Sequence, residues 1–128
     1  MKVLMLSNAK DPANIMDAVE RSKFDVDTIL GIRRGDAIEE YCDVFDKEFI
    51  VLEKGKGRNA TISRDTRITD EADGLIVVVR DSTGSLVVTP IEGAVAASKR
   101  SLMKRMRAHC KPIFVVTTGI VNVRRMNY

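Results

Sequence analysis

The feature that most constrains this chain is a regular alternation between short aliphatic runs and segments able to form helices. The runs lie at residues 2–6, 27–31, 48–52, 74–79 and 112–116, and the fourth of them, Gly-Leu-Ile-Val-Val-Val, is almost entirely aliphatic. A strand without polar positions is typical of a parallel sheet that is buried on both faces. The alternation therefore predicts an α/β fold with a five-stranded parallel sheet between two layers of helices.

Helices are expected between the runs, one that begins near residue 11 and others at residues 36–46, 58–72 and 89–107. The first begins near Asp11, because Asp is a good N-cap and Pro12 suits the first turn. Asp36 is the natural cap of the second. The third contains three Thr and one Ser, so its helix propensity is low and only partial burial is expected. With this succession of elements we predict a doubly wound, Rossmann-like sheet of order 3-2-1-4-5. Residues 117–128 show no clear periodicity.

Length and composition indicate one domain over residues 1–128, with an aliphatic core, since 45% of the residues are apolar and Trp is absent. Cys42 and Cys110 form no Cys-x-x-Cys pair, so we expect no metal site, and a reducing compartment is the simplest interpretation. The apolar run at the N-terminus is too short for a signal peptide or a membrane span. A cytoplasmic protein without a cofactor is expected.

The formal net charge of +3 favours anionic partners. The last third of the chain is basic, and residues 99–111 could form a basic amphipathic helix that contacts nucleic acid. That segment has no aromatic residues for base stacking, so nucleic acid is not the favoured partner. The apolar and basic last helix also favours a homo-oligomer.

Ligands of open parallel sheets bind beyond the carboxyl ends of the strands. Here that rule selects the loops at residues 7–11, 31–36, 53–59 and 80–85, and each of them holds a charged residue. Phosphate is expected on two of these loops, at Ser7, Asn8, Thr83, Gly84 and Ser85. The alternative for the last of these loops is a simple hydroxyl-rich turn.

The turn after the second strand reads Gly31-Ile-Arg-Arg-Gly35-Asp36. Both glycines are expected to be able to take a positive φ, and Arg33 or Arg34 offers a bidentate fork to phosphate or carboxylate. The alternative is a tight turn whose arginines are only solvated.

The run after the third strand, Lys54-Gly-Lys-Gly-Arg-Asn59, opens a helix and directs backbone N–H groups and cations to the same edge. Arg58 and Asn59 are the candidate ligand contacts there, and Arg34 or Arg58 would neutralise the phosphate. A flexible loop capped by Asn59 is the alternative.

Glu92 is the single candidate for catalysis, as a nucleophile on a sugar or as a general base. It or Asp36 would otherwise accept hydrogen bonds from ribose hydroxyls. An acid near a helix N-terminus also complements the helix dipole without any ligand. His109 follows the last helix and is expected to lie away from the strand ends that carry ligands.

The order of these motifs resembles the SLOG superfamily of Rossmann-like domains, and its YspA-like subgroup in particular. The resemblance covers residues 2–116 and rests on Gly31, Arg34, Gly35 and Asp36, on Arg58 and Asn59, on Ala72 and Asp73, and on Thr83 and Gly84. The Gly-Ala-Asp of the family is one residue shorter here, and its Gly-Thr order is reversed. The resemblance implies binding of nucleotides or of nucleotide-derived messengers.

Two groups of related enzymes sharpen the alternatives. The lonely-guy phosphoribohydrolases carry a glutamate three residues after a Gly-Thr turn, where this chain has Val88 or another apolar residue. The nucleoside deoxyribosyltransferases carry a catalytic glutamate at a helix start that is similar to Ile91-Glu92-Gly93-Ala94. We therefore predict a module that senses or sequesters a nucleotide-derived ligand, with an N-glycosidic hydrolase or transferase using Glu92 as one alternative and nucleic-acid binding, as in the distantly related DprA proteins, as another.

Overall fold

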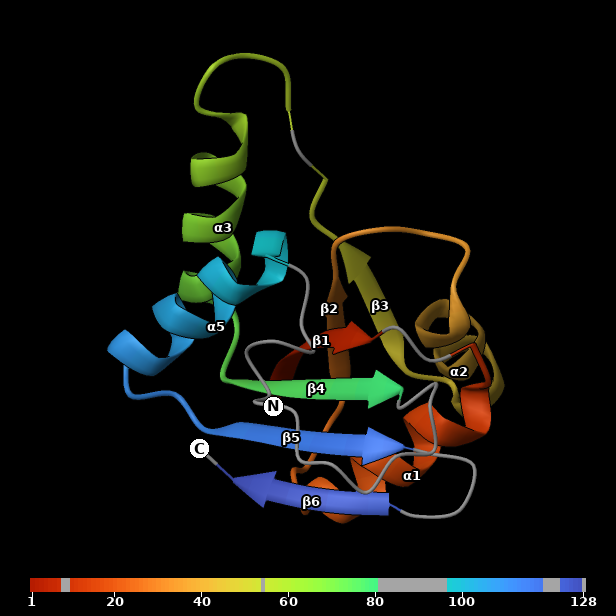
Figure 1. The fold of residues 1–128 in the computed structure, drawn as a ribbon. Coiled ribbons are helices and arrows are strands. Elements are labelled where there is room, and N and C mark those ends of the chain that lie inside the picture. The colour runs from red at the N-terminus through yellow and green to blue at the C-terminus, as the bar shows by residue number, and fades with distance from the viewer. Residues whose placement is uncertain (8–9, 54, 81–96, 119–122, 128) are drawn as a thin grey trace.

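The computed structural model describes residues 1–128 except 8–9, 54, 81–96, 119–122 and 128. In chain order its elements are β1 (Lys2–Ser7), α1 (Pro12–Ser22), β2 (Thr28–Gly31), α2 (Ala37–Phe45), β3 (Glu48–Val51), α3 (Ala60–Glu71), β4 (Gly74–Arg80), α5 (Ala97–Ala108), β5 (Ile113–Thr118) and β6 (Val123–Asn127). The strands form one sheet of order β3-β2-β1-β4-β5-β6 (Figure 1).

The first five strands confirm the predicted parallel sheet. β1 pairs in parallel with both β2 and β4, and the ladder continues in parallel to β3 on one side and to β5 on the other. β6 was not predicted, and it adds to the edge of β5 in the antiparallel direction. Residues 123–127 carry no strand period of their own, so their conformation follows from pairing with a neighbour that lies next to them only in the folded chain.

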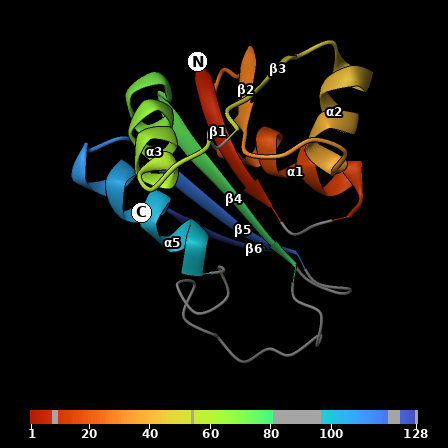
Figure 2. The ribbon, with the colours of Figure 1, turned by 90° about the horizontal axis from the view of Figure 1, so that it is seen from above.

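The helices cover the two faces of the sheet in pairs, α1 and α2 on one face and α3 and α5 on the other (Figure 2). Successive side chains of a strand point to opposite faces. In β4 this alternation sends Leu75 and Val77 into the core beneath α3 and α5, whereas Ile76 and Val78 enter the core beneath α1 and α2. The chain therefore has the three layers that the sequence predicted.

Two helices begin where they were expected. Asp11 is the N-cap of α1, where its Oδ1 accepts a hydrogen bond from the N–H of Ala13 at 2.9 Å, and Asp36 is the N-cap of α2. α3 begins two residues later than predicted, and residues 89–96 of the last predicted helix lie outside the described residues. None of the helices in the described part of the chain is long and apolar enough to cross a bilayer.

α3 is held to the rest of the domain through its second half. Its buried residues are Asp65, Ile68 and Thr69. Beyond its last turn, Nζ of Lys111 donates to the backbone carbonyls of Thr69 and Ala72, and a cation at this end also complements the helix dipole. Near its N-terminus the helix is less buried, since Thr61, Ile62 and Ser63 are exposed.

Candidate functional site

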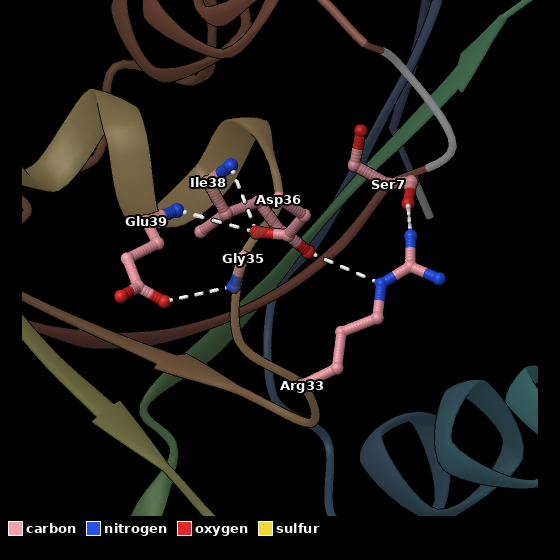
Figure 3. Close-up of polar contacts among 6 residues, drawn as sticks. All are labelled: Ser7, Arg33, Gly35, Asp36, Ile38 and Glu39. Carbon is pink, nitrogen blue, oxygen red and sulfur yellow. Dashed lines mark hydrogen bonds and ion pairs between the residues drawn. The ribbon is translucent and has the colours of Figure 1, made fainter.

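The turn between β2 and α2 is closed by hydrogen bonds within the protein (Figure 3). Oδ1 of Asp36 accepts from the N–H groups of Ile38 and Glu39 at 3.1 and 3.2 Å. The carboxylate of Glu39 reaches back to accept from the N–H of Gly35 at 3.0 Å, as in a capping box. Two amides in the first turn of α2 and the amide of Gly35 before it are thus satisfied by the carboxylates of Asp36 and Glu39.

Arg33 links this turn to the end of β1. Its Nε donates to Oδ2 of Asp36 at 3.2 Å, and its Nη2 donates to the carbonyl oxygen of Ser7 at 3.2 Å (Figure 3). Both carboxylate oxygens of Asp36 are therefore occupied. Arg33 thus connects the end of β1 to the turn after β2, with both hydrogen bonds made to groups of the protein.

Arg34 and the two glycines of the turn behave differently from one another. Arg34 is exposed and makes no hydrogen bond or ion pair with another described residue. Gly35 has the expected positive φ, at 76°, but Gly31 does not, and that part of the prediction was wrong. The reason for glycine at position 31 is space, because a Cβ there would lie 2.6 Å from the ring of Phe49 on the neighbouring strand.

A pocket of about 450 Å³ lies where the chain leaves β3 and enters α3. It is built from the loop that follows the strand and from one face of the first two turns of the helix. Gly57, with φ at 115°, gives the loop a backbone conformation that other residues rarely adopt. The lining residues are Leu52, Glu53, Gly55, Lys56, Gly57, Arg58, Asn59, Ala60, Ser63, Arg64 and Arg67.

The charged side chains in the described lining of this pocket are four cations and one acid. Arg64 is fixed by the nearly fully buried Asp65, with Nη2 and Oδ1 3.1 Å apart, and Arg67 pairs with Glu71 at 3.2 Å on the surface. Lys56 and Arg58 have no hydrogen bond or ion pair within the described ranges of the chain. The two loop cations are thus the ones whose donors are open to a ligand.

The N-terminus of α3 is not capped by a side chain. Asn59 occupies the N-cap position but makes no side-chain hydrogen bond there, and the first turn contains no acid. The alternative interpretation, a loop capped by Asn59, therefore lacks the side-chain hydrogen bond that it implies. Helix N-termini carry a partial positive charge and unpaired N–H groups. Together with the cations, this end of α3 makes the pocket electropositive.

The structure divides the predicted site residues into two groups. Ser7, Arg33, Gly35 and Asp36 meet in the turn after β2, and Arg58 and Asn59 line the pocket after β3. The predicted residues Asn8, Thr83, Gly84, Ser85 and Glu92 lie outside the described residues. Neither group includes them, so the predicted phosphate loops at the ends of β1 and β4 stay predictions.

Four charged residues of the pocket were not among the predicted site residues, namely Glu53, Lys56, Arg64 and Arg67. A signal for the two arginines exists in the sequence. Ala60, Ser63, Arg64 and Arg67 follow the three- and four-residue spacing that places side chains on one face of a helix. Reading that spacing from Arg58 onward would have predicted a basic face next to the loop.

Within the described ranges, the remaining reactive side chains form no second site. No group of three or more metal-ligating side chains occurs in the ranges that the structure describes. Burial raises the pKa of the Cys42 thiol to about 11, which makes it an inert core residue. His109 is exposed and lies shortly before β5 begins, which is the end of the sheet opposite to the pocket.

A scan against protein-family models found no match to this chain, and a search of the curated proteins found none either. The resemblance to SLOG domains accordingly stays a prediction.

Proposed function

We propose that the protein binds a nucleotide or a nucleotide-derived small molecule at the carboxyl edge of the sheet, with a phosphate group in the pocket beside α3. The observation that carries this proposal is the pocket of about 450 Å³, in which the charged residues of the described lining are Lys56, Arg58, Arg64 and Arg67 against the single acid Glu53. Pockets for small molecules typically have volumes of about 300–1,000 Å³. The pocket is therefore large enough for a nucleoside with one or two phosphates.

The proposal is supported by the position of the pocket as well as by its charge. Open α/β sheets bind ligands beyond the carboxyl ends of their strands, and this pocket begins at Leu52, directly after β3. Phosphate is favoured where a helix N-terminus and cationic side chains point to one place. At the start of α3 no acidic side chain of the first turn competes for that place.

Arg58 is the residue expected to contribute most. It is exposed, its guanidinium is not engaged by another described residue, and it directly precedes the N-cap of α3. Arginine presents planar, bidentate donors to phosphate, which lysine does not. Lys56 adds a second charge from the same loop, whereas Arg64 is held in place by Asp65 and shapes the wall.

The test is a thermal-shift screen with the four ribonucleoside 5′-monophosphates and the corresponding diphosphates at millimolar concentration. A ligand that binds only the folded protein raises its melting temperature. We expect a rise with at least one of these nucleotides and a dissociation constant roughly ten- to a hundredfold weaker in Arg58→Ala, since a hydrogen bond to a charged group contributes about 1.5–3 kcal/mol.

Lys104→Ala is the matched control, because Lys104 is an exposed cation of α5 that does not line the pocket. It should bind the same nucleotide as tightly as the wild type does. The proposal is wrong if no nucleotide raises the melting temperature, or if Arg58→Ala and Lys104→Ala weaken binding equally. The second result would point to a general attraction of anions to a basic surface.

A further inference from the structure

Among the described residues that line this cationic pocket, Glu53 is the one acid. It follows Leu52, whose N–H donates to the carbonyl of Gly31 at 2.9 Å and whose side chain is buried. The backbone that leads into Glu53 is therefore fixed to the sheet, although the Glu53 side chain itself is exposed. The Glu53 side chain therefore extends from a fixed backbone position just beyond the carboxyl end of β3.

The Glu53 carboxylate has cations around the same pocket and yet forms no hydrogen bond or ion pair with any residue of the described part of the chain. A carboxylate repels phosphate, so it weakens a site that serves phosphate alone. An ionised carboxylate only accepts hydrogen bonds. A group of the ligand that donates hydrogen bonds is what gives this acid a favourable role.

The other acid that was expected to accept ribose hydroxyls is already engaged. Oδ1 of Asp36 accepts from two amides of α2, and Oδ2 accepts from Arg33. Using Asp36 for a ligand would uncap α2. Glu53 sits at the end of the strand next to β2 and needs to give up no contact with another described residue.

We infer that Glu53 accepts hydrogen bonds from the 2′- and 3′-hydroxyls of a ribose whose phosphate lies on Arg58 and Lys56, so that the pocket selects ribonucleotides over 2′-deoxyribonucleotides. This inference rests on the proposed function. It assigns the two chemical halves of the ligand to opposite charges within one pocket. In nucleotide-binding sheets generally, an acid at a strand end is suited to ribose hydroxyls because the adjacent pair of donors matches two carboxylate oxygens.

The experiment measures dissociation constants by calorimetry for the four ribonucleoside 5′-monophosphates and their 2′-deoxy counterparts. We expect the wild type to bind the ribonucleotide of the best pair roughly tenfold more tightly than its deoxy counterpart, as one charge-assisted hydrogen bond implies. In Glu53→Gln the ratio should fall to within about twofold of one. Arg58→Ala should weaken both members of the pair and keep their ratio.

Glu53→Asp is the second variant, since it keeps the charge and moves it by one methylene, and it should give a ratio between those of the wild type and Glu53→Gln. Equal binding of ribo- and deoxyribonucleotides by the wild type would overturn the inference and leave the proposed function standing. A wild-type ratio that survives in Glu53→Gln would also overturn it. A Glu53→Gln variant that changes the preference among bases while keeping the sugar ratio would assign the carboxylate to a base and refute the ribose assignment. If none of the eight monophosphates binds, the ribose inference falls, and the proposed function falls with it when the ribonucleoside diphosphates also fail to bind.

Discussion

The two loops that enter α2 and α3 follow neighbouring strands, but only the first leads into a helix whose N-terminus is capped by a side chain. In the turn before α2, Asp36 caps the helix, Glu39 reaches back to Gly35, and Arg33 ties the turn to β1. In the loop before α3, Asn59 makes no side-chain cap bond. Acidic side chains therefore satisfy amides at the first turn, and we call it the closed loop. The second loop has no such bonds, lines the pocket with cations, and is called the open loop.

Whether a side chain caps the following helix distinguishes a structural turn from a candidate binding loop in this fold. A helix N-terminus needs acceptors for its first amides. When the protein supplies them, as at Asp36, the helix gains stability and has little left to offer an anion. At α3 the N–H of Ala60 donates to the carbonyl oxygen of Gly57 at 3.4 Å, but no side chain caps the helix, so its dipole and the amides that follow remain to attract an anion.

Substitutions at the two cap positions give the largest expected difference in stability between the two loops. Asp36→Ala removes two cap hydrogen bonds and the partner of Arg33, so it should lower the free energy of unfolding by about 1–2 kcal/mol. Asn59→Ala, the matched variant, should change it by less than about 0.5 kcal/mol, because no cap bond is lost. Urea denaturation of both variants measures the difference. Equal losses at the two positions would contradict the distinction between a closed and an open loop.

The glycines of the two loops give the second test. Gly31→Ala places a Cβ 2.6 Å from the ring of Phe49, which must move, so we expect a loss of about 1 kcal/mol in the free energy of unfolding. Gly55→Ala meets no atom within 4 Å and should change stability by less than about 0.5 kcal/mol. Thermal unfolding of both proteins decides. A Gly55→Ala protein as unstable as Gly31→Ala would show that the open loop is packed more tightly than its contacts indicate.

The smallest expected effect separates the two neighbouring arginines. Arg33→Ala removes a half-exposed ion pair with Asp36 and a bond to Ser7, and should lower the free energy of unfolding by about 0.5 kcal/mol. Arg34→Ala should leave it unchanged, since Arg34 has no such partner among the described residues. Chemical denaturation in low salt is the suitable measurement. A larger loss in Arg34→Ala than in Arg33→Ala would reverse the roles assigned to them.

Much of the fold was predictable because its signals are local. Strand β4 shows its burial on both faces as an apolar run, and Asp11 and Asp36 show two helix starts as side chains that accept from the amides of the next residues. β6 was missed because its strand conformation depends on β5, which no local pattern in residues 123–127 reveals.

The candidate site was predictable only in part. Arg58 and Asn59 were expected from their place after a strand, and both line the pocket. Arg33 was expected to meet a ligand but is bonded within the protein, which depends on how near Ser7 and Asp36 come in space. Glu53 lies in a loop that the strand-end rule selected, but its sequence neighbours predict no role for its carboxylate.

The parallel α/β sheet with charged, glycine-bearing loops at one edge follows from the amino-acid sequence. Its signals, the apolar runs of the strands and the capping residues of the helices, each lie within a few consecutive positions. Only the tertiary structure decided which of those loops is closed and which is open. That depends on contacts between residues far apart in the chain, such as Arg33 with Ser7, and a hydrogen bond of this kind exists only once the strands lie side by side.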